Sequence, residues 1–165
     1  MVVLDKTVFD LAERLGEQLV TRGCFLAAAE SCTGGELAAC ITDVPGSSAW
    51  FDVGFVVYSN AAKQRTLGVP EAVIAQHGAV SQAVVEALVR GIFVNSEADV
   101  AVSISGVAGP SGGSLDKPVG TVWLAFGLRH EPVETLLCHF SGDRASVRQQ
   151  AVRVSLMRLM RLISD

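Results

Sequence analysis

Charged residues and basic runs are scarce in this 165-residue sequence. Only 18% of the residues are charged, the net charge is −4, and Lys and Arg form no cluster. Because proteins that bind nucleic acid usually present a basic surface, this composition argues against nucleic acid as a partner. A few local groups can still bind a small anion, so nucleotides stay open as ligands.

Long apolar runs and metal-ligand patterns are missing as well. No segment approaches the roughly 18 to 20 continuous apolar residues of a membrane-spanning helix. Near the N-terminus, Asp5, Asp10 and Glu13 interrupt the apolar residues, which is not typical of a signal peptide. The Cys residues show no C-x-x-C spacing and the His residues are scattered (Cys24, Cys32, Cys40, Cys138; His77, His130, His139). We therefore expect a cytoplasmic protein with reduced thiols, no membrane contact, no metal and no cofactor.

Half of the residues are hydrophobic, and their spacing alternates between helical and strand periods. Strands are predicted at residues 25–29, 51–58, 99–105, 121–128 and 133–140. Helices are predicted at residues 5–22, 35–42, 60–68, 71–76, 82–92 and from 143 to the end. This order predicts one domain, residues 1–165, with an α/β fold. The expected architecture is a three-layer α/β/α sandwich, with a mixed, mostly parallel sheet of about five strands that ends in an antiparallel hairpin.

The stretch AESCTGG joins the first predicted strand to a helix. Ser31 or Thr33 is a candidate cap of that helix, and Glu36 would complete an S/T-x-x-E capping box with Thr33. The glycines and unpaired N–H groups could equally accommodate an oxyanion or a phosphate. Taken alone, the stretch is most simply a capped turn.

Ligands of such sheets bind beyond the carboxyl ends of the parallel strands, where several polar residues are expected to meet. Lys63 is a candidate base if it is desolvated near a cation such as Arg65, or else an ordinary surface lysine. Tyr58 is the last residue of a predicted strand at this edge. It could steer a proton, or it could be a core residue at the interface with solvent. The loop after Ser105 is rich in Gly and Pro, which is typical of a binding loop or of a merely mobile one. Arg144 could bind an anion, or it could be an ordinary exposed arginine.

Six motifs in this order resemble the CinA C-terminal domain family over about residues 8–160: AESCTGG, GFVVYSNAAKQRTLGV, HGAVS, SISGVAGPSGG, KPVGTVWLAF and FSGDR. That family includes stand-alone nicotinamide-nucleotide amidohydrolases. It often carries Thr at the position of Ser105, so the hydroxyl is retained. Many members have a further domain before this one. The present chain matches the last domain alone, which predicts a free-standing enzyme.

The resemblance implies metal-free hydrolysis of the carboxamide of nicotinamide mononucleotide, giving nicotinate mononucleotide and ammonia. It implies Ser31 as nucleophile, Lys63 as base and Tyr58 as an assisting residue. The substrate-binding residues that it implies are Glu30, Cys32, Thr33, Gly34, Gly35, Ser105, Gly106, Gly109 and Arg144. The alternative is a non-catalytic nucleotide-binding or regulatory module, because many relatives are fused to another catalytic domain.

The last predicted helix carries a wide apolar stripe, which predicts a homo-oligomer if one side stays exposed on a monomer. The residues of this stripe are Val147, Ala151, Val154, Met157, Met160 and Ile163, widened by Leu156 and Leu159.

Overall fold

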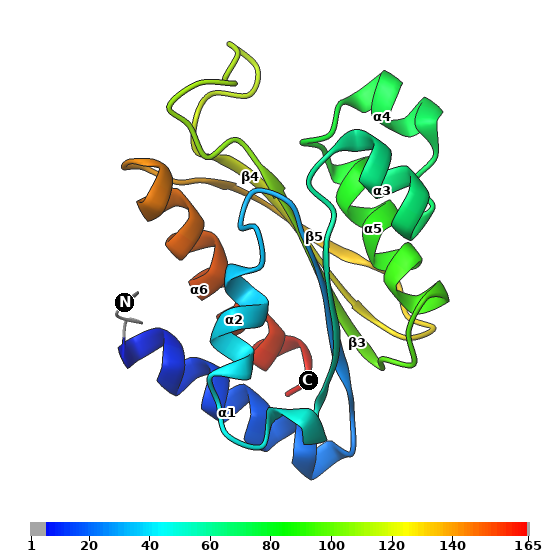
Figure 1. The fold of residues 1–165 in the computed structure, drawn as a ribbon, viewed down its shortest axis with the longest axis vertical. Coiled ribbons are helices and arrows are strands. Elements are labelled where there is room, and N and C mark those ends of the chain that lie inside the picture. Colours follow the sequence, from blue (N-terminus) through cyan, green and yellow to red (C-terminus); the bar gives the residue numbers. More distant parts are fainter. Residues whose placement is uncertain (1–5, 165) are drawn as a thin grey trace.

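The computed structural model describes residues 6–164, which form a single five-stranded sheet with helices on both faces (Figure 1). The strands are β1 (Leu26–Glu30), β2 (Phe51–Val56), β3 (Val100–Gly106), β4 (Thr121–Leu128) and β5 (Glu134–His139). The helices are α1 (Lys6–Arg22), α2 (Glu36–Thr42), α3 (Asn60–Leu67), α4 (Glu71–His77), α5 (Gln82–Val94) and α6 (Arg144–Leu162), with a 3-10 turn at Ser47–Ala49. The predicted elements are confirmed to within a few residues. Residue 5, the expected helix start, lies outside the described residues.

The strand order is β2-β1-β3-β4-β5. Strand β1 pairs in parallel with β2 and β3, whereas β4 is antiparallel to both β3 and β5. Only β4 therefore runs against the other strands, and the predicted mixed, mostly parallel sheet with a closing hairpin is confirmed. The parallel strands β2, β1 and β3 end at the same edge, which places the polar residues after them next to one another.

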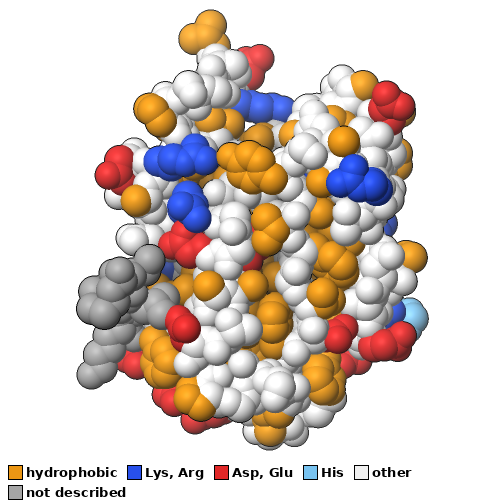
Figure 2. Space-filling model, in the orientation of Figure 1, with side chains coloured by type: hydrophobic (Ala, Val, Ile, Leu, Met, Phe, Trp, Pro, Cys, Tyr) orange, Lys and Arg blue, Asp and Glu red, His pale blue; other side chains and the backbone are white. Residues whose placement is uncertain are grey.

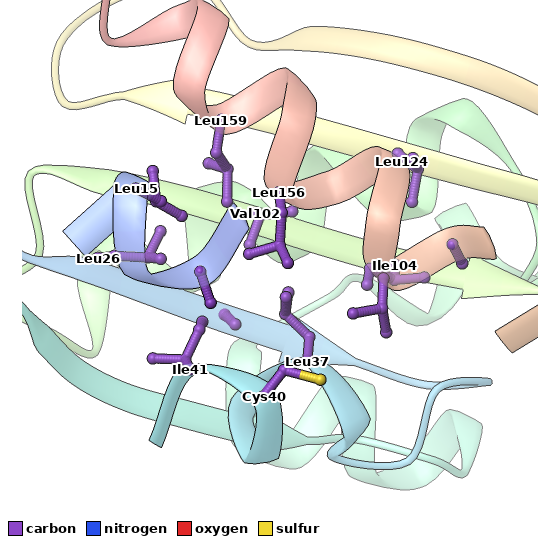
Figure 3. Packing of buried hydrophobic residues seen from close by; sticks show 14 of the residues in the cluster. Leu15, Leu26, Leu37, Cys40, Ile41, Val102, Ile104, Leu124, Leu156 and Leu159 are labelled. Carbon is purple, nitrogen blue, oxygen red and sulfur yellow. The ribbon is translucent and has the colours of Figure 1, made fainter. Parts of the chain in front are cut away.

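Helices α1, α2 and α6 cover one face of the sheet and α3, α4 and α5 the other, so the expected three-layer arrangement is confirmed (Figure 1). Figure 3 shows the first of these layers, where Leu15 of α1 and Leu156 of α6 pack over Leu26 and Val102 of the sheet. Strand β1 is buried along its whole length. A central parallel strand covered on both faces is expected to be continuously apolar, which explains the run Leu26–Ala29 before the buried Glu30.

Helix α3 packs against α5 at very short range. A Cβ atom added to Gly91 of α5 would lie 2.1 Å from the backbone oxygen of Leu67, the last residue of α3. Only glycine permits this approach. The same helix α3 begins with a serine cap, since the side chain of Ser59 accepts a hydrogen bond from the N–H of Ala62. Helix α3 carries Lys63, so this contact fixes the position of the lysine relative to the sheet.

The apolar stripe predicted on the last helix is wrong in part. Val147, Ala151, Leu156, Leu159 and Ile163 are buried as expected, but the side chain of Met157 is 50% exposed. The buried Ser155 occupies the core face in its place, and its hydroxyl donates to the backbone oxygen of Ala151. An α-helix makes one turn in 3.6 residues, so residues at exact three-residue steps drift around the helix. Over the nineteen residues of α6, some of them therefore leave the face that packs on the core.

Among residues 6–164, no helix is both long and apolar enough to cross a membrane.

Candidate active site

The three parallel strands end around a cavity of about 190 Å³. Its lining comes from the segments that follow β1, β2 and β3, from the start of α3 and from the start of α6. The lining residues are Ser31, Cys32, Tyr58, Asn60, Lys63, Ala79, Val80, Ser105, Gly106, Ala108 and Arg144. The topology thus brings the three predicted catalytic residues and four of the predicted substrate-binding residues into one place.

Lys63 and Ser31 contact each other inside this cavity. The ammonium nitrogen Nζ of Lys63 lies 3.1 Å from the Ser31 hydroxyl oxygen, 3.0 Å from the Val57 carbonyl oxygen and 2.9 Å from that of Tyr58. Two of its three polar neighbours are carbonyls, which only accept hydrogen bonds. A neutral amine would donate its two N–H groups to these carbonyls, and its lone pair would then face the hydroxyl of Ser31. This geometry would let a neutral Lys63 accept the hydroxyl proton of Ser31.

Lys63 is almost completely buried, with 1% of its surface exposed. Burial disfavours the ammonium ion and lowers the pKa of Lys63 below its ordinary value of 10.5. The neighbouring Cys32 opposes this shift only as a thiolate. The expected help from Arg65 is not found, because its side chain is exposed and burial alone lowers the pKa.

The thiol of Cys32 lies directly after Ser31 and also lines the cavity. Burial, with a smaller contribution from the carboxylate of Glu30, raises the pKa of this thiol to about 11. The thiol is therefore protonated at neutral pH, whereas the reactive form of cysteine is the thiolate. Ser31, with Lys63 in contact, is therefore the stronger candidate nucleophile of the two neighbours.

The turn after Ser31 is capped differently from the prediction. Helix α2 begins after Gly35, and neither Ser31 nor Thr33 caps it. The buried carboxylate of Glu30 accepts hydrogen bonds from the backbone N–H groups of Gly35 (3.1 Å), Leu37 (3.1 Å) and Ala38 (2.8 Å). The Thr33 hydroxyl is buried and has no partner among the described residues. The S/T-x-x-E pattern predicted the wrong cap, because the Glu30 carboxylate at the end of β1 accepts the hydrogen bonds from the N–H groups at the start of α2.

Five predicted substrate-binding residues do not line the cavity: Glu30, Thr33, Gly34, Gly35 and Gly109. Glu30 faces helix α2 instead. Gly34 and Gly35 have positive φ angles of 59° and 97°, and they line a separate groove between α2 and α6. These two positions are glycine because the turn requires positive φ angles, and not because they line the cavity.

Arg144 and Tyr58 meet at the mouth of the cavity. The guanidinium of Arg144 donates to the Gly109 carbonyl oxygen at 2.7 Å and to the Tyr58 hydroxyl at 3.2 Å. Tyr58 is 60% exposed, and Val56 on the edge strand β2 is 53% exposed. Apolar side chains gather in the middle of the face on which β2 lies (Figure 2).

Arg144 has no carboxylate partner among the described residues, so its charge is available to an anion.

Four lining residues were not among those predicted from the sequence: Asn60, Ala79, Val80 and Ala108. Asn60 lies three residues before Lys63 on α3, so the two side chains share one face of the helix, and this spacing could have indicated it. Ala79 is held by Ser105, whose hydroxyl donates to the Ala79 carbonyl oxygen at 2.9 Å. No sequence pattern links Ala79 to Ser105, because only the packing of the 78–81 segment against the end of β3 brings them together.

Fold and site together define an α/β protein with a buried serine–lysine pair at the carboxyl edge of its parallel strands. Within residues 6–164, no group of three or more His, Cys, Asp or Glu side chains is placed to hold a metal ion. Residues 8–163 match the CinA C-terminal domain. The chain belongs to this family.

Several relatives are similar to this chain over nearly their whole length. The nicotinamide-nucleotide amidohydrolase PncC of Pseudomonas putida is 57% identical over 92% of this chain and 94% of its own, and that of Escherichia coli (strain K12) is 53% identical over 94% of each. The crystal structure of the competence/damage inducible protein CihA from Agrobacterium tumefaciens matches with a TM-score of 0.95, at 36% identity and full coverage of both chains. The expected family and fold are confirmed by these matches.

Proposed function

We propose that this protein is a nicotinamide-nucleotide amidohydrolase that hydrolyses the carboxamide of nicotinamide mononucleotide with Ser31 as nucleophile and Lys63 as base. The observation that carries the mechanism is the 3.1 Å contact between Lys63 Nζ and the Ser31 hydroxyl in the cavity where the parallel strands end. The amide-hydrolase activity is supported by relatives of that name at 51% to 57% identity.

The first half of the reaction transfers the acyl group to Ser31. Lys63 takes the hydroxyl proton of Ser31 while the oxygen bonds to the carboxamide carbon. As the tetrahedral intermediate collapses, its C–N bond breaks and Lys63 returns the proton to the leaving nitrogen, so ammonia departs. The product of this half is a nicotinate ester on Ser31.

Hydrolysis of that ester completes the cycle. Lys63 takes a proton from water, the water oxygen bonds to the ester carbon, and the bond to Ser31 breaks as the serine oxygen recovers the proton. Negative charge develops on the former amide oxygen in both halves, and backbone N–H groups are efficient donors to such an oxygen. The N–H group of Cys32 is our first candidate, because it follows the nucleophile, its residue lines the cavity, and it makes no backbone–backbone hydrogen bond among the described residues. The N–H group of Thr33, whose residue does not line the cavity, is the second.

The cavity of about 190 Å³ is smaller than the roughly 300 to 1,000 Å³ of typical ligand pockets. It can hold the part of the nucleotide that carries the carboxamide, with the phosphate at its mouth. Arg144 lies at that mouth without a carboxylate partner, and we propose that it binds the phosphate.

Replacing Arg144 with glutamine is expected to raise KM for nicotinamide mononucleotide about 10- to 100-fold, because a charge-assisted contact to the phosphate is lost. The KM for the corresponding nucleoside, which lacks the phosphate, should not change. Initial rates of ammonia release on both substrates measure this difference. Arg65→Gln removes an exposed cation elsewhere on the surface and serves as the control. An equal change in KM for the two substrates would contradict the assignment.

The rate should rise with pH because only neutral Lys63 can accept the serine proton. Burial lowers the pKa of Lys63, so the midpoint of the rising limb of kcat/KM is expected below 10.5. Since the pKa is lower in the folded state, the unfolded chain binds more protons between the folded pKa and 10.5, and the free energy of unfolding also rises with pH there. A pH–rate profile together with chemical unfolding at each pH measures both. A rate that stays flat from pH 6 to the alkaline limit of folding would contradict the role of Lys63.

Purified protein should release ammonia and nicotinate mononucleotide from nicotinamide mononucleotide, as followed by a coupled ammonia assay and chromatography. Longer relatives, such as a putative competence-damage inducible protein of Symbiobacterium thermophilum, match this chain over only 38% of their own length. The domain also occurs in larger proteins, so a regulatory nucleotide-binding module is the second candidate. Tight binding of the mononucleotide without product formation would favour that candidate.

A further inference from the structure

The carboxylate of Glu30 is buried directly before the nucleophile, and it faces helix α2 rather than the cavity. We infer that Glu30 is a positioning residue of the active site. Its oxygens accept from the N–H groups at the start of α2, and among the described residues the N–H groups of Cys32, which lines the cavity, and of Thr33, which does not, make no backbone–backbone hydrogen bond. The inference rests on the proposed function, and it concerns how the site is assembled rather than which amide is cleaved.

A count of the backbone donors from residue 31 to residue 38 supports this role. Three of the eight N–H groups donate to backbone carbonyls: Ser31 to Ile104 at 3.0 Å, Gly34 to Ser31 at 3.1 Å, and Glu36 to Thr33 at 3.0 Å. The two oxygens of Glu30 accept three more, from Gly35, Leu37 and Ala38. Among the described residues, the two donors left over are those of Cys32 and Thr33. They are the donors nearest in sequence to the Ser31 hydroxyl.

The same bonds exclude helix α2 as the phosphate site. The sequence alone leaves open whether the AESCTGG turn binds the phosphate or the oxyanion. An incoming phosphate would have to displace a buried carboxylate from the N–H groups of α2, and two such anions repel each other. The free donors next to the nucleophile suit a single oxyanion, and the unpaired Arg144 suits the phosphate.

Glu30 also fixes the path of the turn mechanically. It is the last residue of β1, its backbone pairs with β2 and β3, and its side chain spans five to eight residues along the chain to α2. The five residues between β1 and α2 are therefore held at both ends. A carboxylate accepts at both oxygens, whereas an amide accepts at only one.

Replacing Glu30 with glutamine tests the inference at nearly constant volume. One set of N–H groups then faces an NH₂ group, so the turn shifts and the donors of Cys32 and Thr33 move. We expect kcat for the mononucleotide to fall about 10- to 100-fold, because oxyanion donors act only if they are well placed. KM should stay within about threefold, because the contacts of the bound ground state are unchanged. Asp99→Asn is the matched control, since Asp99 accepts the N–H of Phe25 (2.9 Å) near the opposite end of β1.

A second measurement separates this inference from the proposed substrate. A fluorophosphonate reacts with an activated serine: the Ser31 oxygen bonds to phosphorus, fluoride leaves, and the proton passes to Lys63. Its rate depends on the nucleophile and on the oxyanion donors, and it requires no nucleotide. We expect Glu30→Gln to slow this labelling by a factor similar to the fall in kcat, with Asp99→Asn close to the wild type. If the wild type is labelled at Ser31 but releases no ammonia, the proposed substrate is wrong, and the labelling rates still decide the role of Glu30.

A purely structural role for Glu30 predicts a different pattern. The melting temperature would fall, but kcat and the labelling rate, each per folded molecule, would stay within about twofold of the wild type, and this outcome would overturn the inference. Glu30→Asp provides a second variant if Glu30→Gln does not fold. It keeps both acceptor oxygens but shortens their reach, so it should show the same loss in kcat and labelling to a smaller extent.

Discussion

Ser31→Ala is expected to lower ammonia release from nicotinamide mononucleotide by roughly 10⁴-fold or more, because the acyl group then has no oxygen to attach to. The substitution removes one small hydroxyl that is 8% exposed. Lys63 keeps its hydrogen bonds to the carbonyls of Val57 and Tyr58. The free energy of unfolding should therefore change by only about 1 kcal/mol. Ammonia release, circular dichroism and thermal unfolding measure these quantities.

Ser59→Ala is a suitable control for Ser31→Ala, because it also removes one serine hydroxyl near the site. The hydroxyl of Ser59 caps α3 and does not line the cavity. The control should lose about 1 kcal/mol of stability and keep the reaction that Ser31→Ala loses. Binding of the mononucleotide to Ser31→Ala should persist, since Arg144 is intact. If Ser31→Ala retains wild-type turnover, Ser31 is not the nucleophile.

Lys63→Met is expected to lower kcat by roughly 10³-fold or more, because methionine has a similar length but cannot accept a proton. The side chain stays apolar in a site that is 1% exposed. The carbonyls of Val57 and Tyr58 lose their donor, which costs about 1 to 3 kcal/mol for each one left unsatisfied. The protein should therefore be less stable but folded, and thermal unfolding must accompany each rate measurement.

The double variant Ser31→Ala, Lys63→Met gives the sharper test. Groups that act as one unit are strongly non-additive, so the double variant should be little slower than Ser31→Ala alone. If the two losses multiply, the residues act independently and the proposed pair is wrong. The rising limb of the pH–rate profile should also disappear in Lys63→Met, since the titrating amine is gone.

Much of the fold could be predicted from the sequence because local patterns dictate it. The apolar run of β1 fits only a strand buried on both faces, and Ser59 and Ser81 cap helices as their types and positions indicate. One error arose where a tertiary contact overrides local preference, and another where the predicted stripe did not follow the helical period. Thr33 has the sequence of a cap, yet Glu30 reaches the helix from the strand end. Met157 continues an apolar stripe, yet the helical period turns it to the surface.

The site shows the same division between local and distant effects. The motif resemblance indicated Ser31, Lys63, Tyr58 and Arg144, and the structure gathers all four around one cavity. Their roles, and the expected homo-oligomer, remain predictions. The sequence could not show that Asn60 shares this cavity or that Gly34 and Gly35 face a different groove. Such placements depend on how neighbouring strands end relative to one another, which no short motif encodes.

The sequence by itself determined the family, the order of the elements and the turn AESCTGG, because residue types and spacing fix local conformation. The tertiary structure alone decided the chemistry available at that turn. Parallel pairing of β1 with β2 brought Lys63 within 3.1 Å of a serine 32 residues away, and burial there lowered its pKa. A lysine becomes a base only where the fold removes water from it, and that depends on distant parts of the chain rather than on its neighbours in sequence.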